Sequence, residues 1–147
     1  MADHSSIDEK VVAIASEWKG TPYVHQQSVK GAGCDCLGLL IGVFREVHGR
    51  LPEKPPPYTR EWAESSREEV LLGAATRNLK TLALRGPYHA GSILIFRMRR
   101  NAPAKHCGIV SGKDTFIHSL EGHGVIESPL SEGWTRLVAG HFSMDIG

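Results

Sequence analysis

The stretch GAGCDCLGLL, residues 31–40, constrains the fold more than any other part of the chain. Its two early glycines let the backbone turn tightly and let another group approach closely. Asp35 is a good helix N-cap, which places Cys36 on the first turn of a helix. Apolar residues then recur at helical spacing: Leu37, Leu40, Val43, Phe44 and Val47. Gly49 is expected to end this helix, which the apolar Leu39 and Ile41 on its flanks predict to be well buried.

A first helix is expected upstream of this stretch. Ser6 followed three residues later by Glu9 is a capping-box pattern that predicts its start. The apolar residues at helical spacing are Ile7, Val11, Ile14, Ala15 and Trp18. Gly20 is expected to end the helix.

The sequence downstream changes character twice. Residues 51–60, LPEKPPPYTR, predict an extended surface crossing, because three consecutive prolines fit neither a helix nor a central strand. Helix is expected again from about Trp62 to Leu84, with Gly73 as a possible break. Short β-rich segments separated by turn residues follow: 92–97, 106–110, 115–120, 124–126 and 137–142. Helices followed by a meander of strands predict one α+β domain, residues 1–147, with an antiparallel sheet.

Composition narrows the class of protein. The 147 residues are 41% hydrophobic and 22% charged, which excludes disorder as the main state. The formal net charge of +1 gives no support to nucleic-acid binding, and no apolar run is long enough to span a bilayer. The polar N-terminus lacks the layout of a secretory signal, so we expect a protein made in the cytoplasm. Three cysteines do not form a disulfide framework, and eight histidines are a surplus that suggests chemistry.

The position of Cys36 favours a reactive thiol. Unpaired backbone N–H groups and the helix dipole at the first turn both favour the thiolate, which is the nucleophilic form. The neighbouring Asp35 carboxylate acts in the opposite direction, and the dipole contributes only ~0.3–1 kcal/mol at an exposed terminus. A cationic partner is therefore needed, and a histidine is the usual one.

Two histidines on a predicted hairpin are the candidates for that partner. If the loop between the strands has three residues, 112–114, then Gly108 lies opposite His118 and His106 is its diagonal neighbour on the same face. Diagonal pairs are about 7–8 Å apart at Cα, which two imidazoles can bridge. A two-residue loop would place the histidines on opposite faces. In the first register His106 is the base for Cys36, and His118 holds its imidazole by the other nitrogen.

The remaining cysteines have less specific roles. Alternation along the strand turns Cys107 away from the His106 face, so we interpret it as a packing residue. Cys34 precedes the helix cap and is interpreted as a loop residue rather than the nucleophile. A zinc site is disfavoured, because the C-x-C spacing is not the usual C-x-x-C and adjacent His106 and Cys107 point to opposite faces.

Four motifs resemble the NlpC family of cell-wall cysteine peptidases. CDCLGLL (34–40) is similar to that family's Asp-Cys-Ser-Gly-Leu signature, and KGTPYVHQQSVKG (19–31) to its Gly-Thr-Pro-Tyr loop. HCGIVSG (106–112) resembles its His-Val-Gly-Ile strand, and FIHS (116–119) the strand with its third polar residue. The motifs occur in family order, which makes the resemblance specific.

This resemblance implies a papain-like fold with a catalytic triad of Cys36, His106 and His118 and no cofactor or metal. It implies that Tyr23 helps to stabilise the oxyanion, together with the backbone N–H of Cys36. The position of Asp35 implies binding of the free amine of the peptidoglycan peptide stem, which the family typically cuts after D-γ-glutamate and before the diamino acid. No nucleic-acid or membrane partner is implied.

Longer segments are similar to peptidases encoded among tail genes of phages and gene transfer agents: PYVHQQSVKGAG (22–33), FRMR (96–99) with APAKHCGI (102–109), and ESPL (127–130). That likeness implies delivery to the cell wall in a tail particle, with tail-tip or hub proteins as partners. Two positions depart from the family pattern. Leu37 replaces the serine after the nucleophile, and His25 replaces an aromatic residue, which affects the shape of the substrate subsite.

Two other functions remain open at this point. The same triad could serve an acyltransferase or lipid-modifying enzyme, which a wide apolar groove and activity on acyl esters would indicate. Alternatively, the domain is a catalytically silent module for tail assembly or wall binding, which an unreactive Cys36 thiol would indicate.

Overall fold

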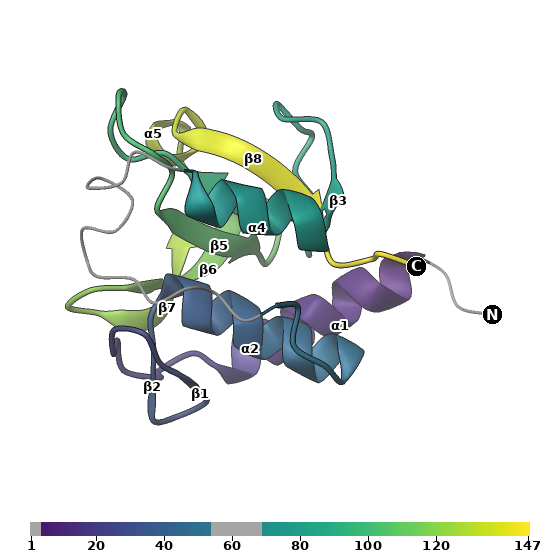
Figure 1. The fold of residues 1–147 in the computed structure, drawn as a ribbon, viewed down its shortest axis with the longest axis vertical. Helices are drawn as coiled ribbons and strands as arrows, with labels where there is room; N and C mark the ends of the chain where they lie inside the picture. The colour runs from purple at the N-terminus through teal and green to yellow at the C-terminus, as the bar shows by residue number, and fades with distance from the viewer. Residues whose placement is uncertain (1–3, 54–68) are drawn as a thin grey trace.

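The computed structural model describes residues 4–53 and 69–147. Its elements, in chain order, are α1 (His4–Glu17), β1 (Ser28–Val29), β2 (Gly33–Cys34), α2 (Cys36–His48), α4 (Val70–Asn78), β3 (Lys80–Thr81), β4 (Ile93–Phe96), β5 (His106–Val110), β6 (Thr115–Leu120), β7 (Gly124–Pro129), α5 (Glu132–Thr135) and β8 (Val138–Ser143). Helices precede a run of strands, so the predicted α+β order is confirmed (Figure 1).

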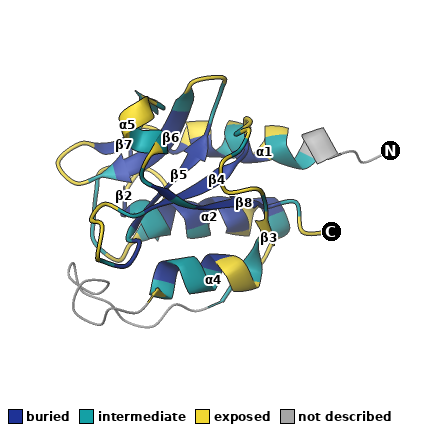
Figure 2. Cartoon of the chain, turned by 90° about the horizontal axis from the view of Figure 1, so that it is seen from above, coloured by how far each residue is buried: buried dark blue, intermediate teal, exposed yellow. Residues whose placement is uncertain are grey.

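The main sheet has six strands in the order β3-β8-β4-β5-β6-β7, and every pairing in it is antiparallel. A separate two-stranded sheet joins β1 to β2 ahead of α2. The central strands β4 and β5 are buried along their whole length, because they are covered on both faces (Figure 2). This burial explains why their sequences are apolar without a simple alternation.

Two apolar clusters hold the layers together. On one face of the sheet, α1 with the turn that follows it, α2 and α4 contribute to a core with Ile93, Ile95 and Ile109; their residues in it include Val11, Trp18, Leu39, Val43, Phe44 and Leu71. On the other face, Trp134 of α5 packs against a smaller cluster made of Leu94, Phe96, Val110, Phe116 and Val138. The sheet is therefore enclosed by helices on both sides, and its strand ends are left to form a site.

Helix α2 has the boundaries that the sequence predicts. Asp35 is the N-cap, and its side chain accepts from the backbone N–H of Gly38. Gly49 is the C-cap in the left-handed region (φ 72°), and its N–H donates to the Arg45 carbonyl. The first helix ends before Gly20, which also has positive φ (88°). That helix begins at His4, however, so Ser6 lies inside its first turn instead of capping it.

The structure corrects the prediction of helix up to Leu84. Helix α4 continues through Gly73 without a break and ends at Asn78, and the next residues pair as β3 with the end of β8. Leu79 is already extended (φ −122°, ψ 164°) because pairing with β8 replaces the helical hydrogen bonds there. The predicted strand 124–126 is longer and runs to Pro129. The crossing expected at 51–60 and the helix start near Trp62 lie largely outside the described residues.

No helix in the described part of the chain combines the length and apolarity needed to cross a bilayer.

Candidate active site

Cys36 is the first residue of α2 and is held there by the Asp35 cap. Asp35 Oδ1 accepts from Gly38 N at 2.7 Å, and its Oδ2 accepts from Gln26 N at 2.8 Å. The carboxylate therefore fastens both the helix and the preceding loop, although it is only 3% exposed. A Cβ at Gly38 would overlap the Gln27 carbonyl, so only glycine lets the loop pack this closely on the helix. The cap that the sequence predicts is confirmed.

The β5–β6 hairpin brings the two imidazoles together. Ile109 pairs with Ile117 and Val110 with Phe116, which leaves the three-residue loop 112–114 and sets Gly108 opposite His118. His106 Nε2 lies 2.8 Å from His118 Nδ1. The predicted register and the diagonal contact are both confirmed.

Gly108 makes room for this contact, a role that the sequence analysis missed. A Cβ at that position would lie 2.8 Å from Phe116 Cδ2 and 3.2 Å from His118 Cβ. The gap opposite His118 is therefore filled by the imidazole itself and by the Phe116 ring, which stacks on it with centroids 4.2 Å apart. A glycine two residues after His106, inside a predicted strand, is the sequence signal for this role, because such a glycine often lets a neighbouring group approach the backbone closely.

A cleft joins the thiol, the first imidazole and the upstream loop. Its lining includes Tyr23, His25, Asp35, Cys36 and His106, and its remaining walls are formed by Leu37, Leu71, Met98, Lys105, Ser119, Leu120 and Glu121. The cleft is thus lined by all the sequence-predicted site residues except His118. His118 is fully buried and reaches the site through its hydrogen bond to His106. The oxyanion role of Tyr23 and the substrate-binding roles of Asp35 and His25 stay predictions.

The loop side of the cleft is ordered by short-range backbone contacts. Tyr23 forms a parallel bridge with Cys34, and the Val24 N–H donates to the Cys34 carbonyl at 3.2 Å. His25 Nδ1 lies 3.9 Å from Asp35 Oδ2, so its ring stands beside the capping carboxylate. The residue that departs from the family pattern at position 25 therefore faces the cleft next to the cap.

The Cys36 thiol is tuned toward the thiolate. Its pKa is lowered to about 5, first by the adjacent Cys107 thiol and then by the hydrogen bond and the charge of His106. Burial and the Asp35 charge act in the opposite direction, as the sequence analysis expects for Asp35. A thiol with this pKa is ionised at neutral pH and is a competent nucleophile.

Cys107 contacts Cys36, which the strand pattern did not predict. It packs in the core on the helix face of β5, as expected, but α2 begins directly beneath it. Its Sγ donates to the Cys36 carbonyl at 3.2 Å, while Cys36 Sγ lies 3.6 Å from the Lys105 carbonyl. The pKa of Cys107 is raised well above its usual value, chiefly by its hydrogen bond to Cys36, so Cys107 stays protonated and donates.

Cys34 has the opposite character. It lies in the short strand β2 rather than in a loop, and it is fully buried. Burial raises the pKa of its thiol to about 11. The two cysteines of the C-x-C motif therefore differ strongly in acidity, and only Cys36 reaches the cleft.

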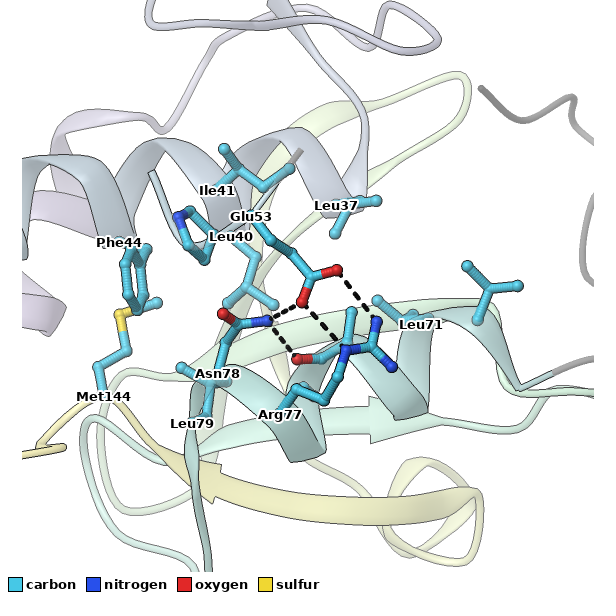
Figure 3. Close-up of a pocket in the computed structure, with 14 residues that line it drawn as sticks. Leu37, Leu40, Ile41, Phe44, Glu53, Leu71, Arg77, Asn78, Leu79 and Met144 are labelled. Carbon is cyan, nitrogen blue, oxygen red and sulfur yellow. Dashed lines mark hydrogen bonds and ion pairs between the residues drawn. The ribbon is translucent and has the colours of Figure 1, made fainter. Parts of the chain in front are cut away.

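A second pocket lies beside the cleft, between α2 and α4 (Figure 3). Its walls are mainly apolar, and Leu37 and Leu71 line both the pocket and the cleft. One rim is polar, where Glu53 accepts from Arg77 Nη2 at 3.0 Å and from Asn78 Nδ2 at 2.5 Å. Among residues 4–53 and 69–147, no three His, Cys, Asp or Glu side chains are grouped so as to hold a metal ion.

Comparison with known proteins points to one family. Residues 20–142 match the model of the NlpC/P60 family. The chain is 29% identical over 135 residues to the gamma-DL-glutamyl hydrolase of Bacillus subtilis (strain 168), covering 92% of this chain and 29% of that protein. It is 28% identical over 130 residues to the murein DD-endopeptidase MepS/murein LD-carboxypeptidase of Escherichia coli (strain K12), covering 88% of this chain and 58% of that protein. The chain thus spans well under two thirds of these relatives.

Solved structures share the fold. NlpC2 from Trichomonas vaginalis superposes with a TM-score of 0.68 at 17% identity, covering 98% of this chain and 48% of that one. The NlpC/p60 domain of the peptidoglycan hydrolase SagA superposes with a TM-score of 0.65 at 20% identity, covering 92% of this chain and 97% of that one. These likenesses confirm the expected papain-like α+β fold.

Proposed function

Because the chain belongs to the NlpC/P60 family, we propose that it is a cysteine peptidase that hydrolyses an amide bond in the peptide stem of bacterial peptidoglycan. The observation that carries the proposal is an acidic thiol at a helix start, open to a cleft and backed by two hydrogen-bonded imidazoles. Relatives named as a murein endopeptidase and a gamma-glutamyl hydrolase support the substrate class.

In the proposed reaction the Cys36 thiolate attacks the scissile carbonyl carbon and forms a tetrahedral intermediate. His106 holds the thiol proton and returns it to the leaving amine, which breaks the C–N bond and leaves a thioacyl-enzyme. Water then attacks the thioester with His106 as base, which releases the acid and restores the thiol. His118 orients the His106 ring throughout by accepting a hydrogen bond at Nδ1.

The backbone N–H of Cys36 and the Tyr23 hydroxyl are the proposed donors to the oxyanion. An N–H at the first turn of a helix has no intrahelical acceptor, so it is available to a developing negative charge. One such donor contributes ~3 kcal/mol in comparable sites. Tyr23 lines the same cleft from the opposite loop, which is where a second donor is needed.

The proposed bond is that between D-γ-glutamate and diaminopimelate, with the free stem amine bound near Asp35. The buried carboxylate at the floor of the cleft supports the binding of an amine. Asn can keep the cap to Gly38 N with its one oxygen, while its NH2 group replaces the acceptor for Gln26 N, so Asp35→Asn is expected to keep the start of α2, to loosen the loop contact and to raise KM for stems with a free amine. Stems acetylated at that amine are the matched control, since their KM is expected to be high for both proteins.

Digestion of purified sacculi tests the proposed activity directly. Wild-type protein is expected to release stem fragments that mass spectrometry identifies, and Cys36→Ser is expected to release none. Cys34→Ala is the matched control, because Cys34 belongs to the same motif but is buried away from the cleft. Equal loss of activity in both variants contradicts the assignment of the nucleophile, and inactivity of the wild type contradicts the proposed substrate.

The apolar pocket in Figure 3 keeps an acyltransferase as a second candidate, because it shares Leu37 and Leu71 with the cleft. An acyl chain seated there would place its carbonyl near Cys36. Turnover of p-nitrophenyl acyl esters that increases with chain length, together with inert sacculi, favours this candidate. Rates that do not depend on chain length exclude it.

We propose further that the protein acts as a component of a phage-like or gene-transfer-agent tail, where tail-tip or hub proteins bind it. The similarity of segments 22–33, 96–99, 102–109 and 127–130 to tail-encoded peptidases supports this placement. Mass spectrometry of purified tail particles from the producing cells is expected to detect the chain in them. Its recovery solely from the particle-free cell fraction contradicts the proposal.

A further inference from the structure

Ser128 on strand β7 lies directly behind the two imidazoles. Phe116 pairs with Ser128 and His118 pairs with Ile126, so Ser128 is the diagonal neighbour of His118 on the same face of the sheet. His118 Nε2 lies 2.9 Å from Ser128 Oγ. The same diagonal step that joins His106 to His118 is thus repeated once more, and it links side chains of three adjacent strands.

The order of protons along this row is restricted by burial. Burial, aided by the charges of His106 and His123, lowers the pKa of His118 to about 3, so its ring is neutral at working pH and carries one N–H. A protonated His106 has N–H on both nitrogens and needs an acceptor at His118 Nδ1. The single proton of His118 must then sit on Nε2, where Ser128 Oγ accepts it. The other tautomer would set two N–H groups against each other.

The surroundings of His118 offer little else to bind that N–H. Phe116 stacks on the ring, and Trp134 meets it edge-on with centroids 5.3 Å apart. In the described part of the chain, Ser128 Oγ is the one hydrogen-bond partner recorded for His118 Nε2. An N–H enclosed by aromatic rings is costly to leave without an acceptor.

We propose that Ser128 is a positioning residue of the proposed catalytic group: its hydroxyl accepts the Nε2–H of His118 and so stabilises the tautomer that presents Nδ1 to His106. Ser128 touches neither the substrate nor the thiol, and it acts through His118. The inference rests on the proposed function for its effect on turnover. Its effect on the tautomer does not depend on that function.

Three variants test the proposal. Ser128→Ala removes the acceptor, Ser128→Thr restores a hydroxyl at the same place, and Ser111→Ala is the matched control. Ser111 also lies on this hairpin and is also hydrogen-bonded, to Thr115 and Glu127, but it does not contact an imidazole. Two readouts are measured: the ring ¹⁵N chemical shifts of His118, which report its tautomer, and kcat on peptidoglycan stems.

Ser128→Ala is expected to move His118 away from pure Nε2–H and to lower kcat about tenfold, the loss that corresponds to one hydrogen bond. Ser128→Thr is expected to restore both readouts, and Ser111→Ala to change neither. A Ser128→Ala protein with an unchanged tautomer overturns the proposal, whatever its kcat. A tautomer change that leaves kcat unaltered overturns it as well. If the wild type hydrolyses no stems, the proposed function fails, while the ¹⁵N shifts still decide the role of Ser128.

Discussion

Two hydrogen-bonded histidine clusters of this protein contain similar types of residue but differ in their burial and in their access to the cleft. The first is the proposed catalytic cluster of Cys36, His106 and His118, in which His106 Nε2 lies 2.8 Å from His118 Nδ1. The second, which we call the Ser92 cluster, consists of Asp8, His89, Ser92 and His141. In the Ser92 cluster Asp8 Oδ2 lies 3.2 Å from His89 Nε2, and His89 Nδ1 lies 3.2 Å from Ser92 Oγ. An acid, an imidazole and a hydroxyl thus follow one another in the order of a hydrolase triad.

The Ser92 cluster nevertheless lacks what makes the first one reactive. Ser92 is fully buried, so no substrate reaches its hydroxyl. Its Oγ already accepts from the backbone N–H of His89 at 3.1 Å and lies 2.8 Å from His141 Nε2. Cys36, by contrast, opens to a cleft and starts a helix. The same order of residue types therefore does not make a site reactive. The reactive group must be open to substrate and must lie where its charged form is stabilised.

Removing one imidazole from each cluster gives the largest contrast. His106→Ala is expected to lower turnover by roughly 10²–10⁴-fold, because the proton acceptor and donor is lost. His141→Ala is expected to leave kcat unchanged and to lower the free energy of unfolding by roughly 1–3 kcal/mol, because buried Ser92 loses a partner. Kinetics on peptidoglycan stems and urea denaturation measure the two effects. Loss of turnover in the His141 variant would contradict the purely structural role of the Ser92 cluster.

A glycine in each cluster allows a finer comparison. A Cβ at Gly108 would press on Phe116 and His118, and one at Gly91 would lie 2.7 Å from Asp8 Cβ at a positive φ of 98°. Gly108→Ala and Gly91→Ala are each expected to cost roughly 1–3 kcal/mol of stability. Only Gly108→Ala is expected to reduce kcat as well, by about ten- to a hundredfold, because it displaces the imidazole pair. Equal kcat values in the two folded variants would break the contrast.

The acidity of the nucleophile is the next point to test. In the wild type, the rate of Cys36 alkylation by iodoacetamide is expected to rise with pH through about pH 5 and then level off, since a lowered pKa keeps the thiolate down to that pH. Cys107→Val removes the thiol that does most to lower the pKa of Cys36 and is expected to move this midpoint to higher pH. Once the pKa of Cys36 exceeds the pH of the assay, each further pKa unit lowers the thiolate fraction about tenfold.

Cys34→Ala is the control for the Cys107→Val variant, because Cys34 is as deeply buried as Cys107 and, like it, does not line the cleft. Its alkylation profile is expected to match the wild type. A Cys107→Val profile that also matches the wild type would assign the low pKa to His106 and the helix start instead.

The smallest effect is expected from the exposed end of the Ser92 cluster. The His89 side chain is 49% exposed, so His89→Gln is expected to change the free energy of unfolding by less than about 1 kcal/mol and to leave kcat unaltered. Thermal unfolding at low and high salt measures the first expectation. A large destabilisation would show that the contact between Asp8 and His89 anchors helix α1 to the loop before β4.

Much of the site followed from local patterns. The Asp35 cap and the helix that begins at Cys36 were predicted correctly, because capping depends on neighbouring residues. For the hairpin the sequence left a two-residue and a three-residue loop open, and the structure has the three-residue loop. The contact between His106 and His118 followed from that register.

Other features could not be obtained that way. The helix expected up to Leu84 ends at Asn78, since pairing with β8, some sixty residues later, overrides the local preference. Alternation correctly turned Cys107 away from His106, but it gave no indication that α2 starts beneath Cys107. The hydrogen bond of Ser128 to His118 depends on how β7 pairs with β6, and Ser128 lies beyond the strand 124–126 that the sequence predicts.

The sequence by itself determined where α2 begins and which cysteine starts it, because these depend on spacings of a few residues, and it named the two histidines that share a face if the hairpin loop has three residues. The tertiary structure alone decided that the pKa of Cys36 is lowered, that the pKa of Cys34 is raised and that Ser92 is buried. Acidity and access depend on which distant segments surround a side chain and exclude water from it, and no local spacing encodes that.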